Sequence, residues 1–197
     1  GREAVVASWL PCYHDYGLFV PLLLTIYNLP VSAVLMSPMD FIKNPLLYVE
    51  VIERYDASMM IGPNFGYMLL GKRMKAANRK VGVKVVLADV SAEPIDPRTL
   101  DVMKETIGID ESAIHLSYGM AECCLMACDV FSEKIVVDKQ ENCVGVGQLS
   151  QASKFGVHFL VVDPSSKSHL EDGSIGMIYL ASPSLASGYW KNQEASK

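Results

Sequence analysis

Ser58-Met59-Met60-Ile61-Gly62-Pro63-Asn64-Phe65-Gly66-Tyr67 is the stretch of sequence that decides the fold. The apolar run 58–61 has the length of a buried strand, and Gly62-Pro63 is a signal that ends it. The chain from Asn64 to about Asn78 then has the pattern of a helix. This stretch therefore predicts a strand that passes directly into a helix, which is the repeating unit of a parallel sheet.

The same alternation extends from this stretch in both directions. Asn44-Pro45 and Asp96-Pro97 are helix-start signals, each with a capping residue followed by proline at the first helical position. Strands are predicted at 4–10, 31–36, 83–87 and 113–117, and helices at 17–27, 45–55, 97–107 and 120–128. Over residues 4–128 the sequence therefore predicts an α/β fold, a mostly parallel sheet flanked by helices.

After Asp129 the character of the sequence changes. Segments 135–137, 156–162 and 173–181 read as strands joined by polar turns such as Glu171-Asp172-Gly173. We therefore expect two parts, an α/β part at 1–128 and a smaller β-rich lobe at 129–197.

The composition narrows the classes of function. The 197 residues include 17 Lys and Arg against 22 Asp and Glu, a net charge of −5, and 50% of them are apolar. This balance argues against a nucleic-acid partner, which normally requires a basic face, and it excludes a disordered chain. The mean hydropathy of +0.22 is high for a free-standing domain. We expect some apolar faces to be covered by parts of a larger enzyme outside this chain.

One segment is long enough to cross a membrane, since Tyr16–Met39 contains no Lys, Arg or Glu and no other charged residue. Pro21, Asn28 and Pro30 interrupt it, so a helix followed by a strand is the better interpretation. We expect no transmembrane segment. The chain begins without Met and without a secretory leader, as expected of a fragment.

The five cysteines show no disulfide framework and no zinc-like spacing. We expect reduced thiols in a cytoplasmic protein. These cysteines are Cys12, Cys123, Cys124, Cys128 and Cys143.

In open parallel sheets, ligands bind beyond the carboxyl ends of the strands. Each of the segments that follow the predicted strands contains polar, aromatic or glycine residues. They are 10–17, 62–67, 88–94 and 117–122. Together, in chain order along one sheet edge, they predict a binding site.

These segments resemble the adenylate-forming superfamily, and more specifically the fatty acyl-AMP ligases. Ser8-Trp9-Leu10-Pro11 followed by Tyr13-His14-Asp15-Tyr16-Gly17-Leu18 is similar to that branch's S-W-L-P-x-Y-H-D-M-G-L. Gly62–Tyr67 is similar to its G-x-P-N-F-A-Y. Ala92-Glu93-Pro94-Ile95, Tyr118-Gly119-Met120-Ala121-Glu122 and Gly188-Tyr189-Trp190 follow in the family's order. The resemblance covers essentially the whole chain.

The resemblance implies activation of a fatty acid by ATP to an acyl-adenylate and pyrophosphate, with transfer to an acyl carrier protein or polyketide synthase module. His14 and Glu122 are the implied catalytic residues, with Glu122 as the Mg²⁺ ligand. The implied nucleotide-binding residues are Ala92, Glu93, Pro94, Tyr118, Gly119 and Met120. The implied acyl-binding residues are Gly62, Asn64, Phe65 and Tyr67.

Several features of the family pattern are missing from this chain. The phosphate loop, the ribose-binding aspartate and the C-terminal lysine-bearing domain are not seen, so we expect the chain to be inactive alone. Cys123-Cys124 stands where the family commonly has Ala-Thr. Two alternatives therefore stay open: an acyl-CoA ligase, and a non-catalytic module that binds acyl chains or partners.

Overall fold

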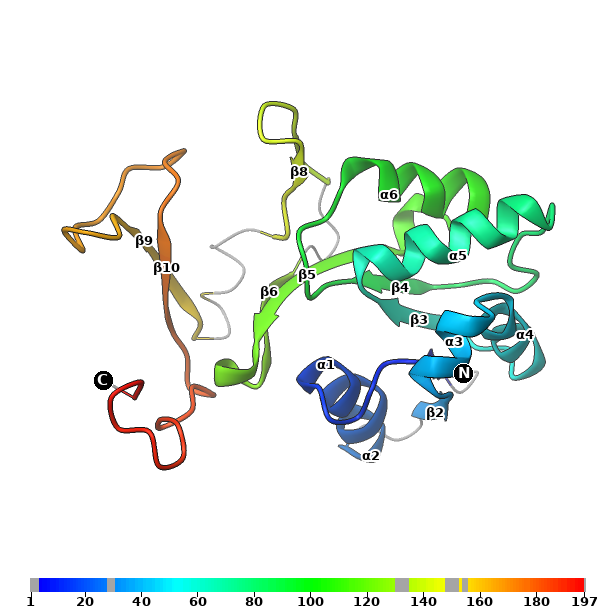
Figure 1. Cartoon of the computed structure of the whole chain (residues 1–197), viewed down its shortest axis with the longest axis horizontal. Coiled ribbons are helices and arrows are strands. Elements are labelled where there is room, and N and C mark those ends of the chain that lie inside the picture. Colours follow the sequence, from blue (N-terminus) through cyan, green and yellow to red (C-terminus); the bar gives the residue numbers. More distant parts are fainter. Residues whose placement is uncertain (1–3, 28–30, 130–134, 148–152, 154–155, 197) are drawn as a thin grey trace.

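The computed structural model describes residues 4–27, 31–129, 135–147, 153 and 156–196. Its centre is a six-stranded sheet in the order β2-β1-β3-β4-β5-β6 (Figure 1). The strands are β1 (Ala4–Ser8), β2 (Val31–Leu35), β3 (Met59–Gly62), β4 (Leu87–Val90), β5 (Ile114–Met120) and β6 (Leu125–Asp129). The first five are parallel, and β6 is antiparallel to β5.

Helices cover both faces of this sheet. The segment α1 (Asp15–Leu18), the π-helical turn η1 (Phe19–Leu23) and α2 (Leu24–Tyr27) lie on one side (Figure 1). On the other side are α5 (Asn64–Ala76), α6 (Pro97–Asp101) and the π-helical turn η2 (Val102–Ile107). Two short helices, α3 (Pro38–Lys43) and α4 (Leu46–Arg54), connect β2 to β3. The predicted parallel sheet flanked by helices is confirmed.

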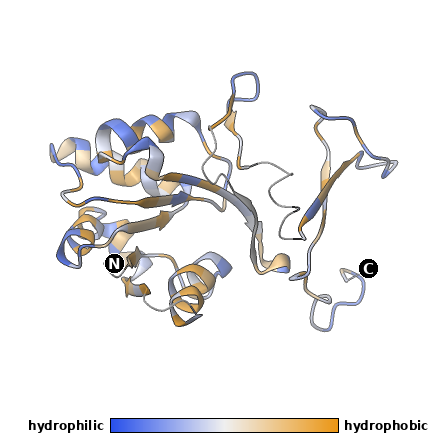
Figure 2. Cartoon of the chain, turned by 180° about the vertical axis from the view of Figure 1, so that it is seen from behind, coloured by the Kyte–Doolittle hydropathy of each residue, from blue (hydrophilic) through white to orange (hydrophobic). Residues whose placement is uncertain are grey.

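Alternation along the strands gives the two faces of the sheet different characters, because successive side chains point to opposite faces. Met60, Ala88, Val90 and Leu116 are fully buried in the main core. The intervening residues of the same strands, among them Asp89, face the segment from α1 to α2. Buried polar side chains such as Asp89 therefore lie on this second face of the sheet. The helices that cover it are largely apolar, as their colouring in Figure 2 shows.

The predicted strand at 83–87 is wrong in its position. β4 occupies Leu87–Val90, where Leu87 pairs with Met59 and Val90 pairs with Gly62. The β-branched residues before Leu87 favour an extended backbone, but pairing with β3 decides which residues enter the sheet.

The predicted helix at 120–128 is also wrong. A short 3₁₀ turn, η4 (Ala121–Cys123), is followed by Cys124 in the left-handed conformation with φ of 58°, and the chain then returns as β6. This reversal makes β5 and β6 an antiparallel hairpin. The helical appearance of small apolar residues here was overridden by strand pairing.

In the described residues after Asp129, the chain forms two small antiparallel ribbons, in agreement with the predicted β-rich lobe. They are β7 (Val137–Asp138) with β8 (Cys143–Val144), and β9 (His158–Val162) with β10 (Met177–Ala181). β9 and β10 meet the hairpin of β5 and β6 through a small cluster around Cys123 and Val157. Among the described residues, no helix is long and apolar enough to cross a membrane.

Candidate active site

Three loops that follow parallel strands surround one cavity of about 430 Å³. His14 comes from the loop after β1, Ala92 from the loop after β4, and Gly119 to Ala121 from the end of β5 and the turn η4. The sequence predicted that these segments would meet at one sheet edge, because the carboxyl ends of parallel strands lie together. We refer to this space as the polar cavity.

His14 stands at the N-cap of α1, where its imidazole is held by neighbouring groups. Its Nδ1 lies 2.6 Å from Oδ1 of Asp15 and 3.2 Å from the backbone N of Tyr16. The His14 side chain is 56% exposed. Because Nδ1 is engaged by the start of α1, the Nε2 edge of the ring is the one that a ligand can reach.

The loop Ala92-Glu93-Pro94 lies beside His14, and its three residues have different surroundings. Ala92 lines the polar cavity with φ of 72°, a conformation in which a Cβ is strained. Oε1 of Glu93 accepts a hydrogen bond of 2.5 Å from the backbone N of Phe65, in the first turn of α5. Pro94 is exposed. Glu93 therefore holds the start of a helix, a contact that the sequence did not indicate.

Among the predicted residues of β5 and the turn after it, Gly119 and Met120 line the polar cavity. Tyr118 does not line the polar cavity. Its ring centroid lies 6.5 Å from that of Phe159 in β9. Glu122 lies one residue beyond the cavity wall formed by Ala121. Whether Tyr118 stacks on a base stays a prediction.

The Glu122 carboxylate is held by the C-terminal segment. It accepts a hydrogen bond from the hydroxyl of Tyr189, and this bond holds the pKa of Glu122 below its usual value. The Glu122 backbone oxygen accepts a 2.6 Å bond from the N of Ala186. In the described part of the chain, no cluster of three or more His, Cys, Asp or Glu residues could hold a metal by itself. Mg²⁺ commonly uses one or two carboxylates together with phosphates and water, so Glu122 fits such a site.

The four predicted acyl-binding residues are not grouped around one open space. A Cβ on Gly62 would meet Trp9 at 3.5 Å, and Tyr67 is 3% exposed in the same closely packed region. Oδ1 of Asn64 accepts hydrogen bonds from the N of Asp96 and from Thr99. Phe65 lines an open cavity of about 360 Å³, the second cavity, together with Trp9, Ile42 and other residues.

A third cavity, of about 260 Å³, lies between the helices α1 to α2 and the sheet. We call it the apolar cavity, because carbon atoms form nearly all of its surface. Its helical wall is Tyr16, Val20 and Leu24. Its sheet wall is Met59, Ile61, Leu87, Asp89, Ser91, His115, Ser117, Tyr118 and Gly119. It shares Tyr16, Ser91 and Gly119 with the polar cavity, so the two spaces adjoin.

A buried polar network lies in the wall of the apolar cavity. Asp89 accepts hydrogen bonds from the hydroxyls of Tyr16 and Ser117, and its Oδ1 is 2.8 Å from Nδ1 of His115. Burial, and next the neighbouring Asp89, raise the pKa of Tyr16 well above its usual value, so its hydroxyl remains a donor. Sequence reasoning missed this network. The available signal was an ionisable residue, His115, inside an apolar run predicted as a buried strand, whereas Asp89 lay in the segment predicted to follow a strand.

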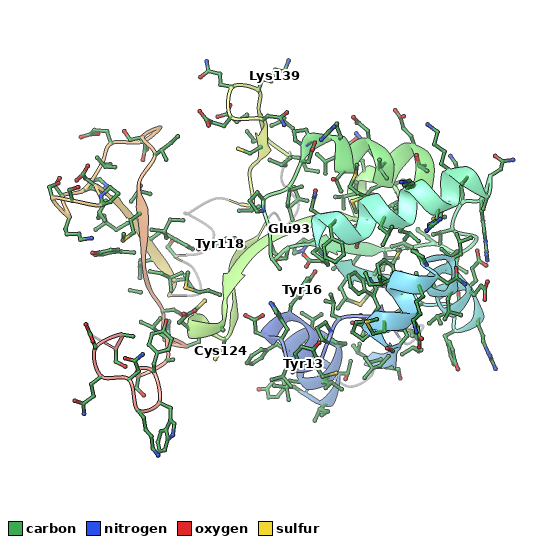
Figure 3. All side chains as sticks on the ribbon, viewed as in Figure 1. Tyr13, Tyr16, Glu93, Tyr118, Cys124 and Lys139 are labelled. Carbon is green, nitrogen blue, oxygen red and sulfur yellow. The ribbon has the colours of Figure 1, made fainter. Side chains whose placement is uncertain are left out.

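Figure 3 labels several side chains in and around this region. Tyr16 lies between the first helices and the sheet, whereas Tyr13 also lines the polar cavity but is 93% exposed. Cys124 is at the tip of the hairpin of β5 and β6. Cys12, Cys123, Cys124 and Cys143 are free thiols.

Comparison with known proteins gives a consistent picture. Residues 1–190 match the family described as AMP-binding enzyme. A 4-hydroxyphenylalkanoate adenylyltransferase of Mycobacterium tuberculosis is 27% identical over 96% of this chain and 34% of its own length. The medium-chain-fatty-acid–[acyl-carrier-protein] ligase TtuA of Teredinibacter turnerae is 28% identical over 100% of this chain and 34% of its own length.

Solved structures that resemble this chain include enzymes that also form adenylates. The fatty acid AMP ligase of Legionella pneumophila superposes with a TM-score of 0.83 at 26% identity, over 100% of this chain and 38% of that one. A fatty acyl-adenylate ligase from the same organism, in complex with acyl adenylate and pyrophosphate, gives a TM-score of 0.82 at 26% identity. The chain therefore spans about a third of the length of the curated relatives that it matches.

Proposed function

Because the chain belongs to the family of AMP-binding enzymes, which use ATP, we propose that it forms the acid-activating region of a fatty acyl-AMP ligase. The resemblance seen in the sequence is confirmed by this membership and by the relatives. The observation that supports the proposal most directly is the polar cavity, where His14, Ala92 and Gly119 meet and which adjoins an apolar cavity. A reacting acid needs both: a polar space for its carboxylate and an apolar space for its chain.

In the proposed reaction, a carboxylate oxygen of the fatty acid attacks the α-phosphorus of ATP. A new P–O bond forms, and the bond to pyrophosphate breaks with its electron pair leaving on pyrophosphate. The protein contributes mainly positioning and stabilisation of charge. His14 lines the polar cavity, and its Nε2 would donate a hydrogen bond to the charge that develops as the acyl carboxylate attacks the α-phosphate.

Glu122 would hold Mg²⁺, and the ion would neutralise charge on the phosphates of ATP. The hydroxyl of Tyr189 orients this carboxylate, and the N–H of Ala186 holds the backbone of Glu122. Ala92, Glu93, Pro94, Tyr118, Gly119 and Met120 are the residues that we propose for the nucleotide. Of these, Ala92, Gly119 and Met120 line the polar cavity.

The apolar cavity is the better of the two candidates for the fatty acyl chain. Both cavities share residues with the polar cavity, but carbon forms a larger part of the surface of the apolar cavity, whose buried polar groups are bonded to one another. Among the residues predicted for acyl binding, Phe65 would contact a chain that entered the second cavity. Gly62, Asn64 and Tyr67 would act by supporting that wall.

The acceptor of the acyl group is proposed to be an acyl carrier protein or a polyketide synthase module. The name of TtuA, a ligase of fatty acids to acyl carrier protein, supports this choice. An acyl-CoA ligase is the alternative. We also propose a cytoplasmic location, and a division of the chain into an α/β part at 1–128 and a β-rich lobe at 129–197.

The test is pyrophosphate release by a full-length protein that carries this chain, supplied with ATP, Mg²⁺ and fatty acids. We expect release that depends on the fatty acid, and none from the 197-residue chain alone. His14→Ala should lower kcat with a smaller effect on the KM for ATP, since it acts on charge that develops in the transition state.

Glu122→Ala should raise the Mg²⁺ concentration needed for half-maximal release while leaving fatty-acid binding unchanged. Glu141→Ala, at an exposed position in the turn between β7 and β8, is the matched control. Fatty-acid binding without any pyrophosphate release would instead identify a non-catalytic module. Offering CoA and carrier protein as competing acceptors then separates the two kinds of ligase.

A further inference from the structure

Tyr16 lies where the three cavities meet. It lines the polar cavity, the apolar cavity and the second cavity, although its side chain is only 3% exposed. Its ring therefore separates the spaces instead of filling one of them. Ser91 and Gly119 are the other residues that line both the polar and the apolar cavity, so a group that passes from beside His14 into the apolar cavity passes between them and this ring.

The position of the ring is set by a hydrogen bond to the sheet. The Tyr16 hydroxyl donates to Oδ2 of Asp89, and Asp89 is itself held by Ser117 at 3.0 Å and His115 at 2.8 Å. The backbone oxygen of Asp89 accepts a further bond of 3.0 Å from the hydroxyl of Tyr67. A buried carboxyl group is costly unless it is fully hydrogen-bonded, so this network has little freedom to move.

A merely structural role does not account for this arrangement. Asp89 stands in a strand between the fully buried Ala88 and Val90, where an apolar residue would be stable without any partner. The fatty acyl-AMP ligase pattern has Met at the position of Tyr16. Methionine is flexible and adapts its shape, whereas a tyrosine ring fixed at its hydroxyl does not. At position 16, this chain therefore has a rigid tyrosine ring, although a flexible methionine would also fill the space.

We propose that Tyr16, fixed by Asp89, determines acyl specificity by keeping a narrow passage between the polar and apolar cavities. The proposal rests on the proposed function for the identity of the site. The passage admits a slender, unbranched alkyl chain and rejects acids that are branched or aromatic next to the carboxylate. The apolar cavity has a limited volume of about 260 Å³, and carbon atoms form nearly all of its surface. The favoured substrates are therefore unbranched acids whose chains are short enough for this cavity.

The first experiment measures binding to the 197-residue chain. Isothermal titration calorimetry compares the binding of decanoic acid with that of branched and aromatic acids with the same number of carbons. The chain should prefer decanoic acid. Tyr16→Ala should reduce this preference by about tenfold or more, the usual size of a change in a pocket wall. Tyr16→Phe keeps the ring but loses its hydrogen bond to Asp89, so it should reduce the preference by a smaller factor.

Tyr48→Phe is the matched control. Tyr48 is also a fully buried tyrosine, and its hydroxyl donates to the backbone oxygen of Ala7 at 2.7 Å, but it lines a closely packed region. This variant should keep the preference of the parent chain. Loss of preference in Tyr48→Phe as large as in Tyr16→Ala would show a general effect of destabilisation and overturn the proposal. An unchanged preference in folded Tyr16→Ala would overturn it as well.

The second experiment separates this proposal from the proposed function. The same acids are supplied to a full-length protein carrying Tyr16, Tyr16→Ala or Tyr48→Phe, and kcat/KM for pyrophosphate release is compared. A shift of at least tenfold toward branched acids in Tyr16→Ala supports the proposal. Activity with an unchanged order of acids contradicts it while leaving the proposed function intact. Absence of release with every acid contradicts the proposed function, and the binding experiment then decides the role of Tyr16.

Discussion

The carboxylate of Glu122 accepts the hydroxyl hydrogen of Tyr189, a residue 67 positions later in the chain. The bond lowers the pKa of Glu122 and, from the other side, raises the pKa of Tyr189. Tyr189 is exposed to solvent and Glu122 is half-buried, so the contact orients the carboxylate more than it stabilises the fold. It lies in the segment where the proposed Mg²⁺ ligand must be correctly placed.

Tyr189→Phe removes this donor and should raise the pKa of Glu122 toward the usual value for glutamate. In the unaltered chain the pKa is lower when folded than when unfolded. The ionised Glu122 therefore stabilises the folded chain above its unfolded pKa, about 4.3. This contribution to the free energy of unfolding is lost as the pH falls through the lower pKa of the folded chain. A ¹³C NMR titration of the Glu122 carboxyl carbon checks the shift. Identical titration curves for the two proteins would show that the hydrogen bond does not form in solution.

A second residue, Glu93, shows how a predicted nucleotide-site residue can carry a structural role. Its carboxylate binds the N–H of Phe65, at the positive end of α5. In the opposite direction, the side chain of Asn64 accepts a bond from the N of Asp96. The loops after β3 and β4 are thus joined by two side chains, and this fixes the position of Ala92 at the polar cavity.

At the scale of elements, α5 and η2 pack at unusually close range. A Cβ on Gly71 would lie 2.1 Å from Cγ1 of Val102, so a glycine is required for this approach. The close contact brings α5 and η2 together over the apolar face of the sheet. The opposite face is covered by the segment from α1 to α2, and the apolar cavity lies between that segment and the sheet.

Gly71→Ala should destabilise the chain although alanine favours helices by about 1 kcal/mol over glycine. Overpacking against Val102 costs typically about 1–3 kcal/mol, and we expect the net loss to be about 1 kcal/mol. Urea denaturation of Gly71→Ala, Val102→Ala and the double variant measures it. In the double variant, the alanine at 102 makes room, so its loss should be smaller than the sum of the two single losses. Strict additivity would mean that the two positions are not in contact.

At the scale of the whole molecule, the two parts of the chain have cores of very different size. The main core unites the sheet with its helices, whereas the cluster that attaches β9 and β10 contains two buried residues, Cys123 and Val157. Among the described residues, the partly buried side chains packed against this cluster are Tyr118, Met120, Phe159 and Leu180. Because few apolar contacts hold the ribbon, it should open at a lower free energy than the sheet.

Phe159→Ala should therefore release the ribbon without weakening the sheet. We expect faster cleavage between residues 156 and 181 in limited proteolysis. The fluorescence of Trp9, which stacks on Phe41 at 3.9 Å in the main core, should report an unchanged urea midpoint. An equal drop in both measurements would show that the ribbon and the sheet unfold as one unit.

Local patterns in the sequence determined the α/β class, the order of most strands and helices, and the positions of the site loops. Asp96-Pro97, for example, starts α6 as predicted, with Asp96 accepting from the N of Arg98. Such features depend on residues within one or two turns of one another, so they can be predicted without knowing the remainder of the fold.

Only the tertiary structure decided which residues of 83–90 entered the sheet, that the segment after Glu122 became a strand, and that Tyr16 met Asp89. The last pair lies 73 residues apart. Each of these outcomes depends on strand register or on the packing of a helix over the sheet. Register shifts of one residue exchange the two faces of a strand, so local preference alone does not select them. The proposed acyl passage beside Tyr16 therefore depends on the folded chain, whereas the polar loops could be predicted from the sequence.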